Sequence, residues 1–240
     1  GVAIVLLVAY LSRRFFDARM RDAAFYGLAG GVGNLGFMGV PMLVALLGEA
    51  AAAAVILAIL VDNIVIGSVG LALAESSGAT QRGWRNDVSD AAVRIFLNPF
   101  IVAMVLGAVF SAFAWELPVF ANSIVKLLAD AAGPCALFAI GVSLMRPDAP
   151  LKSPILALPI AAKLVLHPLL VWLAMTAFGV DPYTTLVAVV AAGLPAAGWV
   201  FIFATRYEAD AGRISAAILL STAIAFATFS SLVWLLGIGR

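Results

Sequence analysis

The sequence is short of the residues that build metal centres and disulfides. It holds one cysteine, Cys135, and one histidine, His167. A single cysteine excludes an internal disulfide and any cysteine-based metal site, and a single histidine argues against a histidine cluster. We therefore expect no metal and no cofactor. Charged residues make up only 11% of the chain, against about 25% in soluble domains, and the net charge of +1 gives no reason to expect nucleic acid as a partner.

Apolar residues are as abundant in this chain as charged residues are scarce. They make up 64% of the chain, and the mean hydropathy is +1.12, so the sequence predicts an all-α polytopic protein of the lipid bilayer. Windows of about 20 apolar residues mark the spanning helices. The first window begins at Gly1 and is short, and no cleavable signal peptide is visible, so we expect N-terminal residues to be missing. The windows are 1–11, 23–47, 50–74, 91–113, 119–145, 154–178, 184–206 and 214–238.

The charges in the loops between these windows predict how the chain sits in the membrane. Lys and Arg gather in alternate loops, whereas the other loops hold Glu49, Glu116 and Asp181 and no basic residue. Short cytoplasmic loops carry the excess of Lys and Arg. We therefore place the basic loops in the cytoplasm and the C-terminus on the non-cytoplasmic side of the cytoplasmic (inner) membrane. The basic loops are 12–22, 75–90, 146–153 and 206–213.

Two predicted helices contain stretches that a helix tolerates poorly. Glycine and proline are unfavourable inside a helix, and in lipid the freed backbone groups need protein or a watered cavity to satisfy them. The two helices run in opposite directions, so the pair of interruptions predicts an inverted-repeat secondary transporter, with ordinary proline kinks as the alternative. The stretches are 30–41, with five glycines, in the window 23–47, and Gly193–Pro195 in the window 184–206.

These interruptions point to the chemistry of a ligand. Proline suits the first turn of a helix, so we expect Pro41 and Pro195 to open the second half-helices near the bilayer midplane. Both half-helices would then aim N–H groups and positive dipole ends at the break. Asn34 can add an amide donor and acceptor at the rim. This arrangement predicts an anion site without a cationic side chain, and a small carboxylate is its natural ligand.

Several polar residues lie inside the predicted spans. An acid at the depth of Asp62 costs at least about 2.5 kcal/mol, so a pathway or proton-relay role is the default and helix packing the alternative. Lys163 could pair with Asp130, which lies at similar depth, or add positive potential to the anion site. His167, one turn after Lys163, reads as a packing histidine, although its reference pKa permits a switch. The candidates for coupling or the pathway are Asp62, Asn63, Asp130, Lys163 and His167.

Further motifs follow one another along the chain: Asn34–Pro41, Leu47-Gly48, Asn98-Pro99, Gly141, Lys163, His167-Pro168, Leu194–Ala197, Ala204, Arg206-Tyr207 and Leu220–Thr222. In residues and order they resemble the auxin efflux carrier family, which includes bacterial malonate-type carriers. The resemblance covers essentially the whole chain. It implies ten helices in two inverted five-helix repeats with two broken, crossing helices, the bile-acid-transporter-like superfamily fold. On that pattern the chain begins within the third helix, and about eight of ten helices are present.

The resemblance also implies a division of the chain. Residues 1–74 would complete the first repeat, and 75–90 would form a cytoplasmic linker. Residues 91–145 would be scaffold helices of the kind that commonly mediate dimerisation, here of a homodimer. Residues 146–240 would supply the transport-domain helices of the second repeat, which shift like an elevator against the scaffold.

Matching the family pattern assigns substrate binding to residues at both breaks: Asn34, Gly36, Gly39, Pro41, Gly193, Pro195, Ala196 and Trp199. Two positions depart from the pattern. Leu35 stands where many members have threonine, and Trp199 stands where many have asparagine. Both changes replace polar groups with apolar ones, so we hypothesise a substrate that is smaller or less polar than a dicarboxylate.

We therefore expect a secondary carrier for a small organic anion, driven by membrane potential or coupled to H⁺ or Na⁺, and not an enzyme. One alternative is a sensor or assembly module that keeps the transporter fold without transporting. The other is a membrane-embedded enzyme built on the charged residues within the spans, for which the sequence offers no recognisable catalytic motif.

Overall fold

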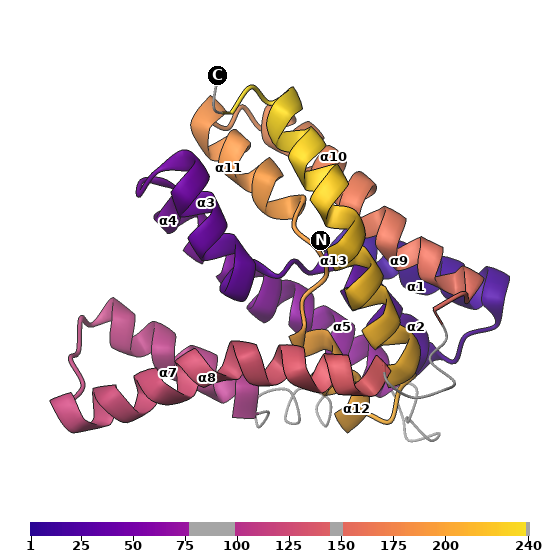
Figure 1. Cartoon of the computed structure of the whole chain (residues 1–240), viewed down its shortest axis with the longest axis horizontal. Coiled ribbons are helices and arrows are strands. Elements are labelled where there is room, and N and C mark those ends of the chain that lie inside the picture. The colour runs from indigo at the N-terminus through magenta and orange to yellow at the C-terminus, as the bar shows by residue number, and fades with distance from the viewer. Residues whose placement is uncertain (77–98, 145–150, 239–240) are drawn as a thin grey trace.

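The structure is a computed structural model, and it describes residues 1–76, 99–144 and 151–238. All regular elements in these ranges are helices (Figure 1), and an isolated antiparallel bridge joins Gly33 to Ala196. The expectations for residues 77–98 and 145–150, which include most of the linker 75–90, lie outside the described residues.

Helices occupy the described part of every predicted window, so the helical class is confirmed. The first half contains α1 (Val2–Phe16), α2 (Met20–Gly31), the π-helical segment η1 (Leu35–Gly39), α3 (Val40–Leu47), α4 (Ala51–Leu60), the π-helical η2 (Val61–Ile66) and α5 (Gly67–Glu75). The second half contains α7 (Pro99–Ala112), α8 (Val119–Leu144), η4 (Pro154–Leu156), α9 (Ala157–Ala161), the π-helical η5 (Ala162–Leu166), α10 (His167–Ala177), α11 (Pro182–Ala192), α12 (Trp199–Arg206) and α13 (Ala211–Leu235).

Length and composition identify three helices that can cross a membrane: Ala51–Glu75, Pro154–Ala177 and Ala211–Leu235. Two shorter apolar helices, Leu35–Leu47 and Pro182–Ala192, lie in the two windows that contain the interruptions. These helices support an integral membrane protein.

The first helix is longer than the sequence predicts. α1 continues beyond residue 11 to Phe16, because Arg13 and Arg14 in its last turn interact favourably with the negative end of the helix dipole. It ends where Asp17 takes a left-handed conformation with φ of 49°.

The main core lies where α1, α2, α5 and α12 meet. Phe25 and Tyr26 of α2 are among its largest fully buried side chains. α1 approaches α2 so closely that a Cβ at Gly27 would lie 2.5 Å from the carbonyl oxygen of Val5. Small residues permit such backbone contact between membrane helices, which bury each other by packing.

A second apolar cluster joins α3, α4 and α11, which group at one end of the molecule (Figure 1). Its fully buried members include Leu43, Val55 and Leu194. At the other end, α8 contacts α12 and α13 but leaves many apolar side chains exposed. An exposed apolar surface of this kind suits lipid or another protein.

Long-range hydrogen bonds show which ends of the helices lie together. The Tyr26 hydroxyl donates to Asp210 Oδ2 at 3.0 Å, and the Tyr207 hydroxyl donates to Glu75 Oε1 at 2.9 Å. These bonds join the ends of helices next to the basic loops, which the charge pattern places together in the cytoplasm. The Tyr183 hydroxyl donates to the Leu47 carbonyl at 3.0 Å and joins two loops predicted on the opposite side.

Candidate substrate site at a helix crossing

The first helical interruption is a short extended segment between α2 and η1. α2 ends at Gly31, and Val32 follows with φ −113° and ψ 130°. The helix resumes at Leu35, with Asn34 as its N-cap residue. A helix that would otherwise run across the membrane is thus divided by residues 32–34.

The second interruption lies between α11 and α12. α11 ends at Ala192, and α12 begins at Trp199 with Gly198 as its N-cap. Residues 193–198 form a compact link whose residues are all buried. Leu194 within it is fully buried in the cluster with Leu43 and Val55.

The two interruptions cross and bind each other through their backbones. The Asn34 N–H donates to the Pro195 carbonyl at 2.9 Å, and the Ala197 N–H donates to the Val32 carbonyl at 3.3 Å. Gly33 and Ala196 face each other in the antiparallel bridge between these bonds. The crossing therefore supplies partners for peptide groups that neither helix can satisfy alone, as an apolar environment requires.

Pro195 does not open the second half-helix of its pass, so this part of the expectation is wrong, whereas Pro41 does lie at the start of α3. Pro195 lies in the link, ahead of the N-cap of α12. Pro41 lies in the first turn of α3, but the helix has already resumed at Leu35 through η1. Proline lacks an N–H and clashes with the carbonyl four residues earlier, so the preceding turn widens. In that turn the Gly39 N–H donates to the Asn34 carbonyl at 3.0 Å.

Asp62 supports the first interruption from within η2. Its Oδ2 accepts the backbone N–H of Gly33 at 3.0 Å, and its side chain is buried. The neighbouring Asn63 donates to the Ile59 carbonyl at 2.9 Å, and its Oδ1 is buried without a hydrogen-bond partner among the described residues. Only Asp62 of these two side chains therefore acts at the crossing itself.

Lys163 supports the second interruption from within η5. Its side chain is fully buried, and Nζ donates to the carbonyl of Ala192, the last residue of α11, at 2.8 Å. Nζ also lies 2.8 Å from His167 Nδ1. His167 is buried one turn along the same helical pass, just before Pro168.

Gly33 brings the buried acid and the buried amine together. Its N–H donates to Asp62, and a Cβ added at Gly33 would lie 3.2 Å from Lys163 Nζ. The two charged side chains form no direct ion pair among the described residues. Asp130 is exposed on α8 and pairs with neither, so the predicted Asp130–Lys163 ion pair is wrong.

The predicted substrate residues divide into buried and exposed groups. Asn34, Gly39, Gly193, Pro195 and Ala196 are buried, Gly36 and Pro41 are exposed, and Trp199 is half-buried against Gly67 and Phe203. Leu35 packs into the cluster around Leu43 and therefore lines no open site.

Two cavities of this structure lie away from the crossing. One, of about 500 Å³, is bordered by Leu6, Tyr10, Arg13 and Arg14 of α1. The other, of about 570 Å³, is apolar and lies between α10, α11 and α13. Within the described ranges no group of His, Cys, Asp and Glu could hold a metal ion.

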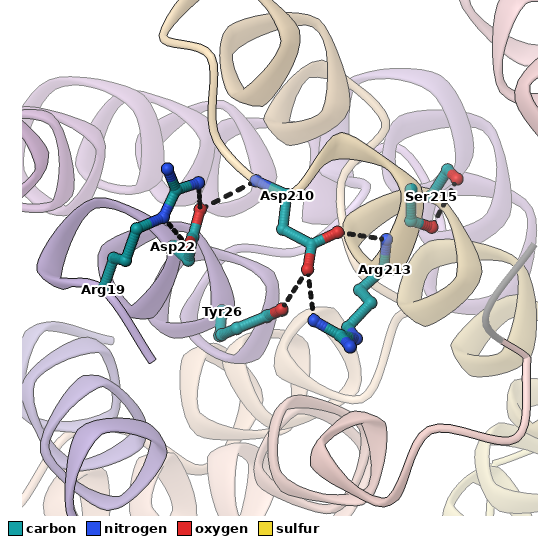
Figure 2. Close-up of polar contacts among 7 residues, drawn as sticks. Arg19, Asp22, Tyr26, Asp210, Arg213 and Ser215 are labelled. Carbon is teal, nitrogen blue, oxygen red and sulfur yellow. Dashed lines mark hydrogen bonds and ion pairs between the residues drawn. The ribbon is translucent and has the colours of Figure 1, made fainter. Parts of the chain in front are cut away.

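A polar network at the predicted cytoplasmic end goes beyond what the sequence predicts (Figure 2). Asp22 accepts from Arg19 at 2.7 Å and from the Asp210 backbone N–H at 2.9 Å. Asp210 in turn accepts from Tyr26 and from Arg213. The hydrogen bond to Asp22 raises the pKa of Arg19. The network ties the start of α2 to the start of α13, and its only signal in the sequence is acids among the arginines of two basic loops.

Comparison with known proteins decides the family. The family described as "Membrane transport protein" matches residues 1–235. A protein of Rhizobium meliloti (strain 1021), described as "Putative malonate transporter", is 34% identical over 239 residues, which cover 99% of this chain and 73% of that protein. The chain belongs to the auxin efflux carrier family of membrane transport proteins. The family and this relative are transporters, not enzymes, so the enzyme alternative falls and the chain is a transporter of the membrane.

Proposed function

We propose that this transporter is a secondary carrier that binds a small organic anion, a carboxylate, at the crossing of its two interrupted helices. The observation that carries the proposal is the backbone pairing between residues 32–34 and 195–197. It brings together the N-terminal ends of α12 and of the η1–α3 helix. Such ends present N–H groups without intrahelical partners and a positive dipole, which favour an anion.

The arrangement around the crossing supports two inverted repeats. In each half a long helical pass, an interrupted pass and a further apolar pass follow one another: α1, α2–α3 and α4–α5, then α9–α10, α11–α12 and α13. Tyr183 bonds to the end of α3, whereas Tyr26 bonds near the start of α13. These contacts suit interrupted passes of opposite direction, the pattern of alternating-access carriers.

The remaining helices suit a scaffold. α7 and α8 contribute no residue to the crossing, and α8 exposes an apolar surface that includes Phe120, Leu128 and Phe138. We assign them to the part against which the transport domain moves, by analogy with elevator-type carriers, and to the contact of a homodimer. We assign coupling to the buried side chains Asp62, Lys163 and His167 behind the crossing.

Malonate is the first substrate to test, because the relative in Rhizobium meliloti is described as its transporter. The hypothesis of a less polar substrate loses one of its two supports, since Leu35 is buried in the core. Trp199 remains as the other support for that hypothesis, because it lies half-buried at the start of α12. A panel of mono- and dicarboxylates supplied to proteoliposomes ranks these possibilities. Preference for a monocarboxylate that Trp199→Asn reverses would favour the less polar substrate.

The crossing itself is tested by three substitutions. We expect Asn34→Ala, Pro41→Ala and Pro195→Ala each to abolish carboxylate uptake into proteoliposomes while the protein stays folded. Asn34→Ala removes the amide at the rim, and replacing either proline restores an N–H that lets a regular helix form in its place. Pro182→Ala, at the exposed start of α11, is the matched control.

Wild-type rates in all three variants would contradict the site. Specific carboxylate binding by the wild type without any flux, under imposed pH and voltage gradients, would instead favour the sensor or assembly module.

A further inference from the structure

A broken helix in a secondary transporter offers a place for a cation as well as for an anion. Carbonyl groups at the C-terminal end of the first half-helix carry the negative end of the dipole and are the usual ligands of a coupling cation. In this chain α11 ends at Ala192. The carbonyl oxygen of Ala192 already binds Lys163 Nζ at 2.8 Å. The chain itself thus places a positive group at the negative end of α11.

The surroundings of this amine are those of a cation site. Lys163 is fully buried, and its second contact is His167 Nδ1 at 2.8 Å. An ammonium has only donors, so Nδ1 accepts and the ring proton lies on Nε2. The carboxylate of Asp62 lies nearby, because its Oδ2 accepts the N–H of Gly33 at 3.0 Å, and a Cβ at Gly33 would lie 3.2 Å from Lys163 Nζ. A carbonyl oxygen and an imidazole nitrogen therefore contact one buried positive charge, and a carboxylate lies nearby without touching it.

We propose that Lys163 is a resident cation that takes the position of a mobile coupling Na⁺ at the crossing, so that the carrier moves its anion without sodium. The inference rests on the proposed carrier function and names the ion requirement of the same site. A second cation at the Ala192 carbonyl would meet the ammonium at close range, where charges are poorly screened. Lys163 thus determines ion specificity and touches no substrate.

Removing the amine should have the opposite effect. In Lys163→Ala the Asp62 carboxylate still accepts the N–H of Gly33, and the Ala192 carbonyl loses the ammonium that it binds in the wild type. Carboxylate and carbonyl oxygens are the ligands that hard cations prefer. The variant should therefore gain a sodium site that the wild type lacks. A lysine with a merely structural role would lower stability without creating any preference among ions.

The first measurement uses the full chain in detergent without substrate. Its melting temperature is followed as NaCl replaces choline chloride at constant ionic strength. We expect no change for the wild type or for Lys152→Ala, an exposed-lysine control. Lys163→Ala should show a saturable rise of about 3 °C or more once Na⁺ reaches about ten times its dissociation constant. If Lys163→Ala does not fold, Lys163→Ser serves in its place.

The second measurement is malonate uptake into proteoliposomes by the wild type, at equal rates in Na⁺ and in choline. A saturable sodium-specific rise in the melting temperature of the wild type, a requirement for Na⁺ in uptake, or no sodium response in the Lys163 variant would each overturn the proposal. Absence of carboxylate uptake in every medium would refute the carrier function instead, and the melting curves would still decide the role of Lys163.

Discussion

Asp62 and Lys163 show why two charged side chains persist inside an apolar chain. Each binds a backbone group that a helix interruption has freed: Asp62 accepts the N–H of Gly33, and Lys163 donates to the carbonyl of Ala192. A peptide group left unpaired in an apolar interior is costly. The acid thus serves a free donor and the amine a free acceptor.

Two substitutions of Asp62 distinguish the contribution of its hydrogen bond to Gly33 from the contribution of its negative charge. Asp62→Ala should lower the free energy of unfolding by about 1–3 kcal/mol, because the buried N–H of Gly33 loses its acceptor. Asp62→Asn keeps an acceptor and should lose less. Denaturant unfolding in detergent measures both, with Glu49→Ala as an exposed-acid control. Equal losses in the Ala and Asn variants would show that the bond to Gly33 is not what Asp62 contributes.

Single residues also mark the limit of sequence reasoning. Depth along a helix suggested that Asp130 could meet Lys163, but depth does not fix the direction of a side chain around the helix axis. Asp130 faces outward on α8, and Lys163 turns to the end of α11. A π-helical segment at Lys163 adds a rotation that a regular 3.6-residue period does not contain.

Among the elements, the positions of the two interruptions follow from the sequence, but the way each helix resumes after its interruption does not. The non-helical residues 32–34 and 193–198 fall in or beside the stretches of glycine and proline that a helix tolerates poorly. The preference of proline for the first turn of a helix does not locate the start of α12, because Pro195 lies ahead of the N-cap Gly198. Near Pro41 the chain resolves the missing N–H by widening the preceding turn, which is a property of packing and not of local preference.

The network that joins α2 to α13 should be a measurable part of the stability of the transporter. Tyr26→Phe removes the hydroxyl that donates to Asp210 from a fully buried ring, and should cost about 0.5–1.5 kcal/mol. Tyr10→Phe, an exposed tyrosine on α1, should be close to neutral. Denaturant unfolding of both variants makes the comparison. A neutral Tyr26→Phe would mean that Arg213 alone satisfies Asp210.

The cap of α11 predicts a small dependence on pH. Asp181 accepts the Thr184 N–H at 2.9 Å, and hydrogen bonding to Thr184 lowers the pKa of this exposed carboxyl. A lowered pKa in the folded state adds stability above the unfolded value of about 4 and loses it as the pH falls through the folded value. Asp181→Asn keeps a capping acceptor that does not ionise, so the melting temperature should fall less steeply below about pH 4. If the melting temperature of Asp181→Asn fell as steeply with pH as that of the wild type, this role of the Asp181 cap would be contradicted.

For the whole molecule, orientation is the property to test. The loop charges place Lys152 in the cytoplasm and Glu116 outside. On a Cys135→Ser background, a membrane-impermeant thiol reagent added to intact cells should label Glu116→Cys and should reach Lys152→Cys only after permeabilisation. The reverse pattern would invert the topology while leaving the crossing intact.

Long-range pairing is the part of the molecule that the sequence could not supply. Helix content and the grouping of loops follow from hydropathy and charge, which are local properties. Asp210 accepts a bond from Tyr26, 184 positions away, and its N–H donates to Asp22, 188 positions away. No periodicity in the sequence predicts either bond. The same holds for the pairing of Asn34 with Pro195. The charge of a loop predicts its side of the membrane, but the packing of the helices determines which residues bond to one another there.

The crossing is held by peptide groups, which every amino acid brings with it. The bonds at its centre run from the N–H groups of Asn34 and Ala197 to the carbonyls of Pro195 and Val32. Side chains at these positions can therefore change during evolution without dismantling the frame, and one ancestral scaffold can acquire new cargoes by substitution alone. Proline is the exception at positions 34 and 197, because it has no N–H to donate to the carbonyls of Pro195 and Val32.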